Sequence, residues 1–437
     1  MSDEQVQDLG FWGAFSIGIG GIVGGGIFAT LGIAVAEARG SAPLSFLVGG
    51  LVALLTAYSY SRLSQTFPDE GGTVSFVNRG FGAGYVAGSL NTLLIFSYAV
   101  IMALYANAFA TYAASLLPRS AGALRTDLLA GGVLILFALL NVSRAAQMER
   151  IGGVLNVVKL AVLGGFILLG LAASGMTPAR LGPAEWVSPP QIFVTGMLVF
   201  LSYEGFELIA NAAPRVQRPA RNLPLAFFGS IAVAMAIYVA IVVVAVGHLP
   251  FEELEAKRSY ALAAVAETFM GPAGFVVMAL GAIVAAASAI NSDFFGSTRL
   301  VSMLAESGPA PWRRAGVLWG GHPWQMILIT GLALLSATLL ELHTLSAVSS
   351  AGFLLVFAAV NGANARLARA TESARWVSGL GVMACLGALG AMLAQAGGQR
   401  AHRHEVFIIG ALAVAPFVFR AVDHAARAVV ARLRLQV

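Results

Sequence analysis

The 437-residue sequence has little charge and a single cysteine, and each shortage excludes a class of protein. Only 11% of the residues are charged, 58% are hydrophobic, and the mean hydropathy is +0.82. A soluble domain carries about 25% charged residues, so a water-exposed globule is excluded and we predict an integral membrane protein. One cysteine, Cys385, rules out an intrachain disulfide, a cysteine-based zinc site and an iron–sulfur cluster.

The six histidines and the basic residues predict no further site. His402 and His404 are two residues apart and would point to different faces of a helix. The formal net charge is +5, but the basic residues are scattered between apolar runs, so no nucleic-acid partner is expected. We therefore expect no cofactor and no metal site.

Charge-poor stretches indicate membrane-spanning helices, each of about 20 residues. Twelve candidates begin near Phe11, Ser41, Phe81, Leu128, Ile151, Pro189, Leu223, Thr268, His322, Thr344, Trp376 and Val406. The residues before the first run include Asp3, Glu4 and Asp8, which are unlike the basic start of a cleavable signal. The first run is therefore expected to remain in the protein, with membrane lipid around it.

The distribution of basic residues predicts the orientation. The sequence has 17 Lys and Arg residues after the even-numbered spans and 8 after the odd-numbered spans, with Lys159 inside a span. Because basic residues favour the cytoplasmic side, we predict a multi-pass protein of the cell membrane with both termini cytoplasmic. An even number of spans is what this orientation requires.

Two of the candidate spans are unlike the others. The first contains the run IGIGGIVGGGIF, and six glycines are too many for a continuous helix at about 1 kcal/mol each. The sixth places Glu204, Gly205 and Glu207 in the middle of an apolar run. We expect both spans to be interrupted. For the first span alone, close helix packing through Gly20 and Gly24 is the alternative.

The sixth span is also the first of a second group of five. Because five is odd, a second copy would enter the membrane from the opposite side. The sequence thus predicts an all-α fold of twelve transmembrane helices in a single transporter domain, residues 1–435. Its inverted repeats cover about 11–175 and 189–366, and two helices, about 376–435, are appended. Interrupted helices at matching positions of inverted halves indicate a substrate site near the midplane.

Several motifs resemble those of the amino acid, polyamine and organocation (APC) transporter superfamily. They are GIGGIVGGGIF, FLSYEGFELIANAAPRVQRPARNLPLA, AVGHLPFEEL, SAINSDFFGSTRLVSMLAESGPAP and a lysine in the fifth span. Within the superfamily they are most similar to the archaeal broad-specificity, proton-coupled amino acid transporters. The resemblance implies a LeuT-like five-plus-five fold with alternating access, in which the unwound parts of spans 1 and 6 hold the substrate.

The resemblance also implies roles for residues at the two breaks. The substrate-binding set is Ile22, Gly24, Gly25, Gly26, Phe200, Leu201, Ser202 and Glu204. Free N–H groups at the three glycines could hold a carboxylate, and carbonyls at the second break could accept from an ammonium. Together they would recognise an α-amino acid. Tyr203 or Phe206 would gate the site, although either residue could instead be core packing.

Lys159 is the expected proton-coupling residue. It lies nine residues beyond Arg150, which is about 13 Å into a core about 30 Å thick. A buried ammonium costs several kcal/mol and could lose its proton during transport. In the resembling transporters a lysine here occupies the cation position of sodium-coupled relatives. The alternative is a permanent ion pair with Glu207 or Asp293.

The acidic residues set this chain apart from the resembling family. Glu204 and Asp293 stand where relatives usually carry apolar or small residues. A carboxylate at Glu204 would favour small or cationic substrates, unless the group is protonated or paired and never meets the ligand. Glu207 falls where relatives often carry an acid, with a structural or gating role or a part in proton coupling.

These observations predict a proton-coupled symporter of amino acids rather than an enzyme. The expected partners are an amino acid or amine substrate, protons and lipid. An amine or polyamine carrier and an amino acid exchanger are the nearest rivals. A membrane-embedded enzyme would need a nucleophile or paired acids near a bilayer surface, and a channel would need a filter-like loop; neither pattern is found in the sequence.

Overall fold

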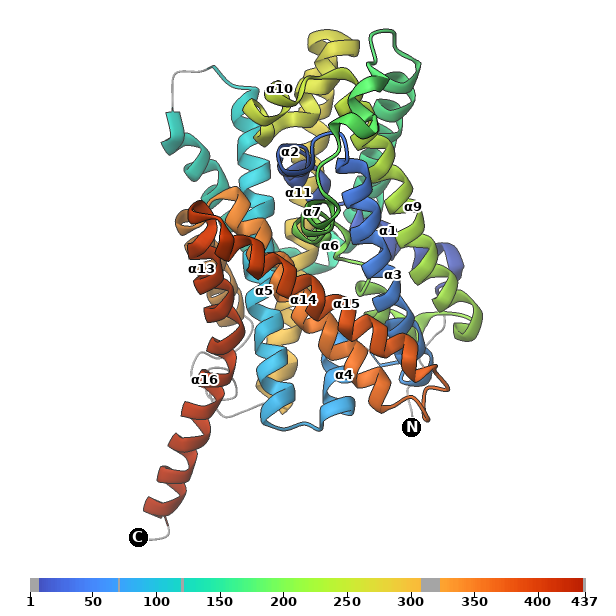
Figure 1. Ribbon diagram of the computed structural model, residues 1–437. Helices are drawn as coiled ribbons and strands as arrows, with labels where there is room; N and C mark the ends of the chain where they lie inside the picture. The colour runs from blue at the N-terminus through green and yellow to red at the C-terminus, as the bar shows by residue number, and fades with distance from the viewer. Residues whose placement is uncertain (1–7, 70, 119–121, 308–322, 435–437) are drawn as a thin grey trace.

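The computed structural model describes residues 8–69, 71–118, 122–307 and 323–434 (Figure 1). Asp3, Glu4, His322 and the side chain of Arg150 lie outside the described residues. The described chain is helical, with two isolated β-bridges, Leu9 to Val216 and Arg39 to Trp186, as its only extended pairings. The predicted all-α class is confirmed.

Both spans predicted to be interrupted are bent. Helix α1 (Phe11–Ile22) meets α2 (Gly26–Ala38) at 48°. Helix α7 (Pro189–Leu198) is followed by the 3-10 turn η4 (Phe200–Tyr203) and by α8 (Leu208–Asn211). The chain bends by 52° between α7 and the segment Phe200–Asn211. The second break contains Gly205 with a φ of 106°, a backbone conformation that residues with a Cβ atom rarely adopt.

Long apolar helices make up most of the remaining bundle. They are α3 (Ala42–Thr66), α5 (Tyr85–Ser115), α9 (Pro219–His248), α14 (Leu342–Arg366) and α15 (Arg375–Gly398), with the shorter α13 (Pro323–Leu339). Among the described residues, seven helices are long and apolar enough to cross a membrane, or nine when each bent pair counts as one span. This supports a multi-pass membrane protein, and the count of twelve stays a prediction.

The fourth and fifth predicted spans lie in one continuous helix, α6 (Gly122–Ala172). Their predicted starts, near Leu128 and Ile151, leave the polar run SRAAQMER between the two spans. That run contains neither glycine nor proline, and most of its residues favour helix, so the backbone stays helical through it. The apolar parts of α6 are Thr126–Asn141 and Gly153–Ala172, which correspond to the two predicted spans.

Two other helices carry local irregularities or extend from the bundle. Helix α11 (Ala261–Ser307) is kinked at Gly271, whose φ is 67°, directly before Pro272. The C-terminal α16 (Arg403–Arg434) extends below the other helices at the lower left of Figure 1. Two short helices, α4 (Gly72–Phe81) and α10 (Phe251–Ala256), lie between the longer ones in sequence.

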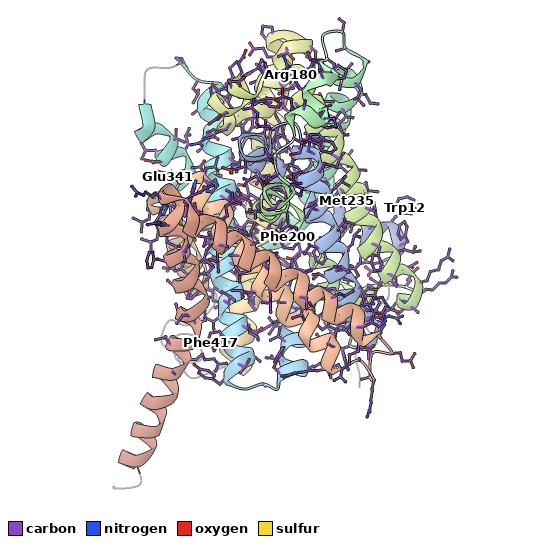
Figure 2. All side chains as sticks on the ribbon, viewed as in Figure 1. Trp12, Arg180, Phe200, Met235, Glu341 and Phe417 are labelled. Carbon is purple, nitrogen blue, oxygen red and sulfur yellow. The ribbon has the colours of Figure 1, made fainter. Side chains whose placement is uncertain are left out.

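The interior of the bundle is built around α5 and α14. In their most apolar windows 83% and 89% of the residues are buried, against 22% for Gly153–Ala172 of α6 and 28% for α15. Helix α5 packs on α11 and α6, α3 packs on α9, and α14 packs on α15. Figure 2 shows Phe200, on η4, at the centre of this packing and Trp12 at its margin. The second break therefore lies deep in the protein.

Candidate functional site

The two breaks cross each other at a pair of glycines. A Cβ atom built on Gly21 would lie 2.6 Å from the carbonyl oxygen of Gly205, and a Cβ on Gly205 would overlap the backbone of Gly21. Only glycine at both positions allows the two backbones to approach this closely. The glycines of the first span thus act in close packing at Gly21 and in the interruption at residues 23–25.

Tyr238 of α9 bridges the two breaks. Its hydroxyl lies 2.7 Å from the carbonyl oxygen of Ile22 and 2.9 Å from that of Ser202. Both carbonyls belong to backbone that has left the regular helical pattern, where buried oxygens need new donors. The role of this residue could not be predicted from the sequence, because an isolated tyrosine in an apolar helix is typical of core packing.

The beginning of α2 lies beside Ser202 of η4. Gly26 is so close to Ser202 that an added Cβ would lie 2.9 Å from the Ser202 Cα, and the hydroxyls of Thr30 and Ser202 are 2.9 Å apart. The ring of Tyr105 covers Gly25. The first N–H groups of α2 have no acceptor within their own helix, so this end of α2 offers donors next to Ser202.

Serines of α14 satisfy the backbone where α7 ends. The hydroxyls of Ser346 and Ser350 donate to the carbonyl oxygen of Leu198 at 2.8 and 3.0 Å, and the Leu201 N–H donates to Ser350 at 3.2 Å. The carbonyl of Leu201, expected to face the substrate, accepts from the Glu204 N–H at 3.0 Å. The sequence analysis gives α14 no role, although its serines stand out in an apolar run.

Two carboxyl groups near the breaks are buried without hydrogen-bond partners for one oxygen each. Glu204 is 3% exposed, its Oε1 has no partner among the described residues, and its Oε2 lies 3.5 Å from the Tyr105 hydroxyl, a long contact. Asp293 of α11 is also buried, and its Oδ2 has no partner in the described part of the chain. Buried carboxyl oxygens without a partner are rare, so both groups are candidate ligand contacts, and the Glu204 carboxyl also lies beside that of Glu207.

Glu207 is tied to the break itself. Its carboxylate accepts from the Gly205 N–H at 2.8 Å and from the Tyr98 hydroxyl at 3.3 Å. It lines a cavity of about 30 Å³ together with Tyr98 and Gly71. A larger cavity of about 410 Å³, lined in part by Arg79, shares Gly71 with the first. Glu207 therefore holds the turn and faces the side of the molecule where the loop after α3 lies.

Lys159 of α6 contacts the first broken span directly. It is 1% exposed, and its Nζ donates to the carbonyl oxygen of Gly20 at 2.6 Å. The amide of Asn156, one turn earlier, fills the space where a Cβ of residue 20 would be. Among the described residues no carboxylate lies within ion-pair distance of Lys159, so the alternative pair with Glu207 or Asp293 is not formed here.

The two candidate gating aromatics are both buried in packed surroundings. The Tyr203 hydroxyl donates to the carbonyl oxygen of Phe46 at 2.7 Å, and its ring packs on Tyr238. Phe206 packs on the rings of Tyr60 and Phe357. In this conformation each ring contributes to the core.

The chain matches a known protein family over most of its length. Residues 9–417 match the family described as amino acid permease. The chain belongs to this family. YbaT, an inner membrane transport protein of Escherichia coli, is 32% identical over 81% of this chain and 82% of its own length. The uncharacterized protein MJ0609 of Methanocaldococcus jannaschii is 30% identical over 80% of each chain. The methylthioribose transporter of Bacillus subtilis is 26% identical over 79% and 77%.

Membership in the amino acid permease family confirms two of the predictions. The resemblance to amino acid, polyamine and organocation transporters is shown, and the protein is a membrane transporter rather than an enzyme. Its family transports amino acids, so its substrates are small molecules. The individual site residues and the coupling ion remain proposals.

Proposed function

We propose that the protein is a proton-coupled symporter that takes up amino acids by alternating access. The observation that carries this proposal is the crossing of two broken helices at Gly21 and Gly205, deep in the bundle. Interrupted helices at matching positions place backbone donors and acceptors at a site near the midplane. The family description, amino acid permease, supports the substrate class.

The packing supports the inverted repeat. With spans 1–5 and 6–10 as the two halves, the second span corresponds to the seventh and the third to the eighth. Helix α3 packs on α9, and α5 packs on α11, so corresponding helices lie together. We propose the five-plus-five arrangement of twelve spans on this basis, with α15 and α16 appended outside it.

The substrate would be held between the start of α2 and η4. The N–H groups of Gly25 and Gly26 would bind its carboxylate, helped by the positive end of the α2 dipole. Its ammonium would meet the acidic side of the site, where Glu204 has an oxygen without a donor. Because both groups would be buried, the attraction between the two charges would be much stronger here than in water.

Proton coupling would act through the Lys159 contact with Gly20. A charged ammonium makes a stronger hydrogen bond to a carbonyl than a neutral amine does. Gly20 lies three residues before the break, so loss of the proton would loosen α1 from α6 at the point where α1 must move. Protonation and movement of the first span would thereby be linked.

Release would follow the cavities beyond Glu207. They lead toward the loop after α3, which the arginine count assigns to the cytoplasm. On this orientation both cavities would lie on the inner side, and the proposed substrate residues are themselves buried. We propose that both termini are cytoplasmic for the same reason.

An amine or polyamine carrier is the second candidate function. It is favoured by one specific observation: Glu204 and Asp293 each bury an oxygen that has no donor in the described residues. An organic cation would supply donors to both. Competition by amino acids without a cationic side chain, such as alanine, distinguishes the two candidates. Alanine should compete for an amino acid carrier but not for an amine carrier, whose site does not bind a carboxylate.

Uptake into sealed proteoliposomes tests the proposed function. The wild type should accumulate amino acids under an inward proton gradient, and replacing sodium by potassium should change nothing. Lys159→Ala and Lys159→Gln should bind substrate and exchange it but lose accumulation. The only other lysine, the partly exposed Lys257, provides the control Lys257→Gln, which should behave as wild type. Normal gradient-driven accumulation by both Lys159 variants would refute the coupling role.

A further inference from the structure

A cluster of histidine and glutamate side chains lies apart from the broken helices. Its members are Glu37 at the end of α2, His343 at the start of α14, His402 in the 3-10 turn η7 (Arg400–His402), and Glu405 at the start of α16. Possible ligand atoms of Glu37, His343 and His402 all lie within 4.8 Å of one another. In Figure 2 the labelled Glu341, which directly precedes α14, marks this margin of the bundle.

We propose that this cluster is a binding site for a divalent transition-metal ion, with Zn²⁺ as the best fit. His343, His402 and Glu37 would be the ligands, and water would complete the coordination. Two imidazoles and one carboxylate form a ligand set suited to zinc, and three protein ligands leave an open position.

Glu405 fixes the ring nitrogen that each histidine would offer. Its Oε1 lies 2.8 Å from the His343 Nδ1, 3.2 Å from the His402 Nδ1 and 3.1 Å from the Thr344 hydroxyl. A carboxylate that accepts from the Nδ1–H group of a neutral imidazole leaves Nε2 with a lone pair. Both histidines would therefore present Nε2 as the ligand atom, with Glu405 as a positioning residue.

Glu37 faces the same point. Its Oε2 accepts from Gln191 at 2.9 Å, which turns Oε1 toward the His343 Nε2 at 3.9 Å. That separation is too long for a hydrogen bond. Two ligands at about 2.1 Å from a tetrahedral ion are about 3.4 Å apart, so a small inward shift would let one ion contact both.

The charge and the size of the site favour a metal ion over other ligands. Neither Glu37 nor Glu405 pairs with a lysine or arginine among the described residues, so two carboxylates face the site with no permanent cation. The cavity they line, together with both histidines and Gln399, is about 30 Å³. This is room for an ion with about one bound water but too little for an amino acid.

The site also joins parts that alternating access would separate. Glu37 belongs to the second half of the broken first span, whereas His343 and His402 belong to α14 and to the turn between α15 and α16. A bound ion would hold α2 against these helices and slow transport. This regulatory consequence rests on the proposed function, and the binding site itself does not.

Metal titration of the purified full-length protein tests the binding site. Isothermal titration with Zn²⁺, and the visible absorption of Co²⁺ as a spectroscopic probe, should show one site per chain with micromolar or tighter affinity near pH 7.5. His343→Gln, His402→Gln and Glu37→Gln should each weaken binding by more than tenfold, and Glu405→Gln should weaken it by about 10–100-fold. His404→Gln is the matched control, because His404 lies two residues from His402 and is not one of the three ligands.

A second measurement separates regulation from binding. Zn²⁺ added outside sealed proteoliposomes should inhibit uptake by the wild type, and the double variant His343→Gln/His402→Gln should transport without inhibition. Absence of stoichiometric binding by the folded wild type, or equal binding by that double variant, overturns the metal site. Inhibition of the wild type by acid alone, without metal binding, overturns it as well. Binding that leaves transport unchanged overturns the regulatory consequence only, and binding is measurable even if no amino acid is transported.

Discussion

The hydroxyl of Tyr238 lies 2.7 Å from the carbonyl oxygen of Ile22, the last residue of α1 before the first span breaks. The same hydroxyl is 2.9 Å from the carbonyl of Ser202 in the second broken span. One side chain from α9 thus holds the ends of both interruptions. Any movement of the end of α1 relative to η4 has to stretch or break this contact.

Tyr238→Phe should loosen the two breaks without emptying the core. The ring remains, but the one O–H donor that the buried carbonyl oxygens of Ile22 and Ser202 share is lost, and of the two only Ile22 keeps another donor among the described residues, the Gly24 N–H. Loss of a donor to a buried carbonyl costs about 1–3 kcal/mol in the free energy of unfolding. We expect a lower thermal midpoint in detergent and a weaker substrate affinity. Tyr85→Phe, which removes a more exposed tyrosine-to-carbonyl bond, is the control and should change neither. Equal stability and affinity in both variants would argue against the bridging role.

Side chains at Gly25 and Gly26 should block binding of carboxylate-bearing substrates. A Cβ on Gly25 would lie 2.7 Å from the Tyr105 ring, and one on Gly26 would lie 2.9 Å from the Ser202 Cα. Gly25→Val and Gly26→Ala should each reduce affinity more than tenfold in a substrate-dependent thermal-shift assay. Gly164→Ala on α6, where a Cβ meets no atom within 4 Å, should bind normally. Undiminished affinity in the two site variants, with the protein folded, contradicts a carboxylate site at α2.

Much of the arrangement follows from local sequence, because interruptions and apolar length are local properties. The glycine run at 18–26 and the glycine at 205 leave too little helix propensity to resist bending, and both bends are found where expected. The continuous α6 was missed because polar residues do not by themselves end a helix.

The rest of the site depends on contacts between residues far apart in sequence. Tyr238 meets Ile22 across 216 positions, and Ser350 meets Leu201 across 149. No hydrophobic periodicity in the sequence indicates such a pairing. The contacts of the bridging tyrosine and of the serines of α14 are therefore seen only in the three-dimensional structure. The same holds for the cluster of Glu37, His343 and His402, since a spacing rule for metal ligands examines only His402 and His404.

The ion pair between Asp8 and Arg215 should make the N-terminal segment sensitive to acid. Arg215 donates to both Asp8 oxygens at 2.9 and 2.6 Å, and this hydrogen bonding holds the pKa of Asp8 below its ordinary value of 3.8. A lowered folded pKa stabilises the folded state above pH 3.8, and the contribution is lost as the pH falls through the lowered value. Beside it, the Leu9 N–H donates to the Arg215 carbonyl and the Gln217 N–H to the Leu9 carbonyl.

Hydrogen exchange of the Leu9 and Gln217 amides measures that effect. After correction for the intrinsic pH dependence of exchange, their protection should be constant from pH 7 to 5 and should fall below about pH 4. Asp8→Asn should show the lower protection at every pH. Protection that is independent of pH in the wild type would show that the ion pair does not hold this segment.

Glu204→Gln should separate charge from hydrogen bonding in substrate selection. The amide keeps the shape and the contact with Tyr105 but cannot carry a negative charge, and one oxygen of Glu204 has no donor among the described residues. A buried carboxylate attracts a cationic group strongly and repels an anionic one. Competition uptake with lysine, arginine, alanine, serine and glutamate should therefore show at least a tenfold loss for the cationic amino acids in Glu204→Gln, with alanine and serine within about threefold of wild type. Glu185→Gln, at an exposed partner of Arg39, should leave the whole series unchanged. If the wild type instead takes glutamate tightly, and Glu204→Ile has the same selectivity as wild type, the carboxylate does not face the ligand and Glu204 serves only the structure of the break.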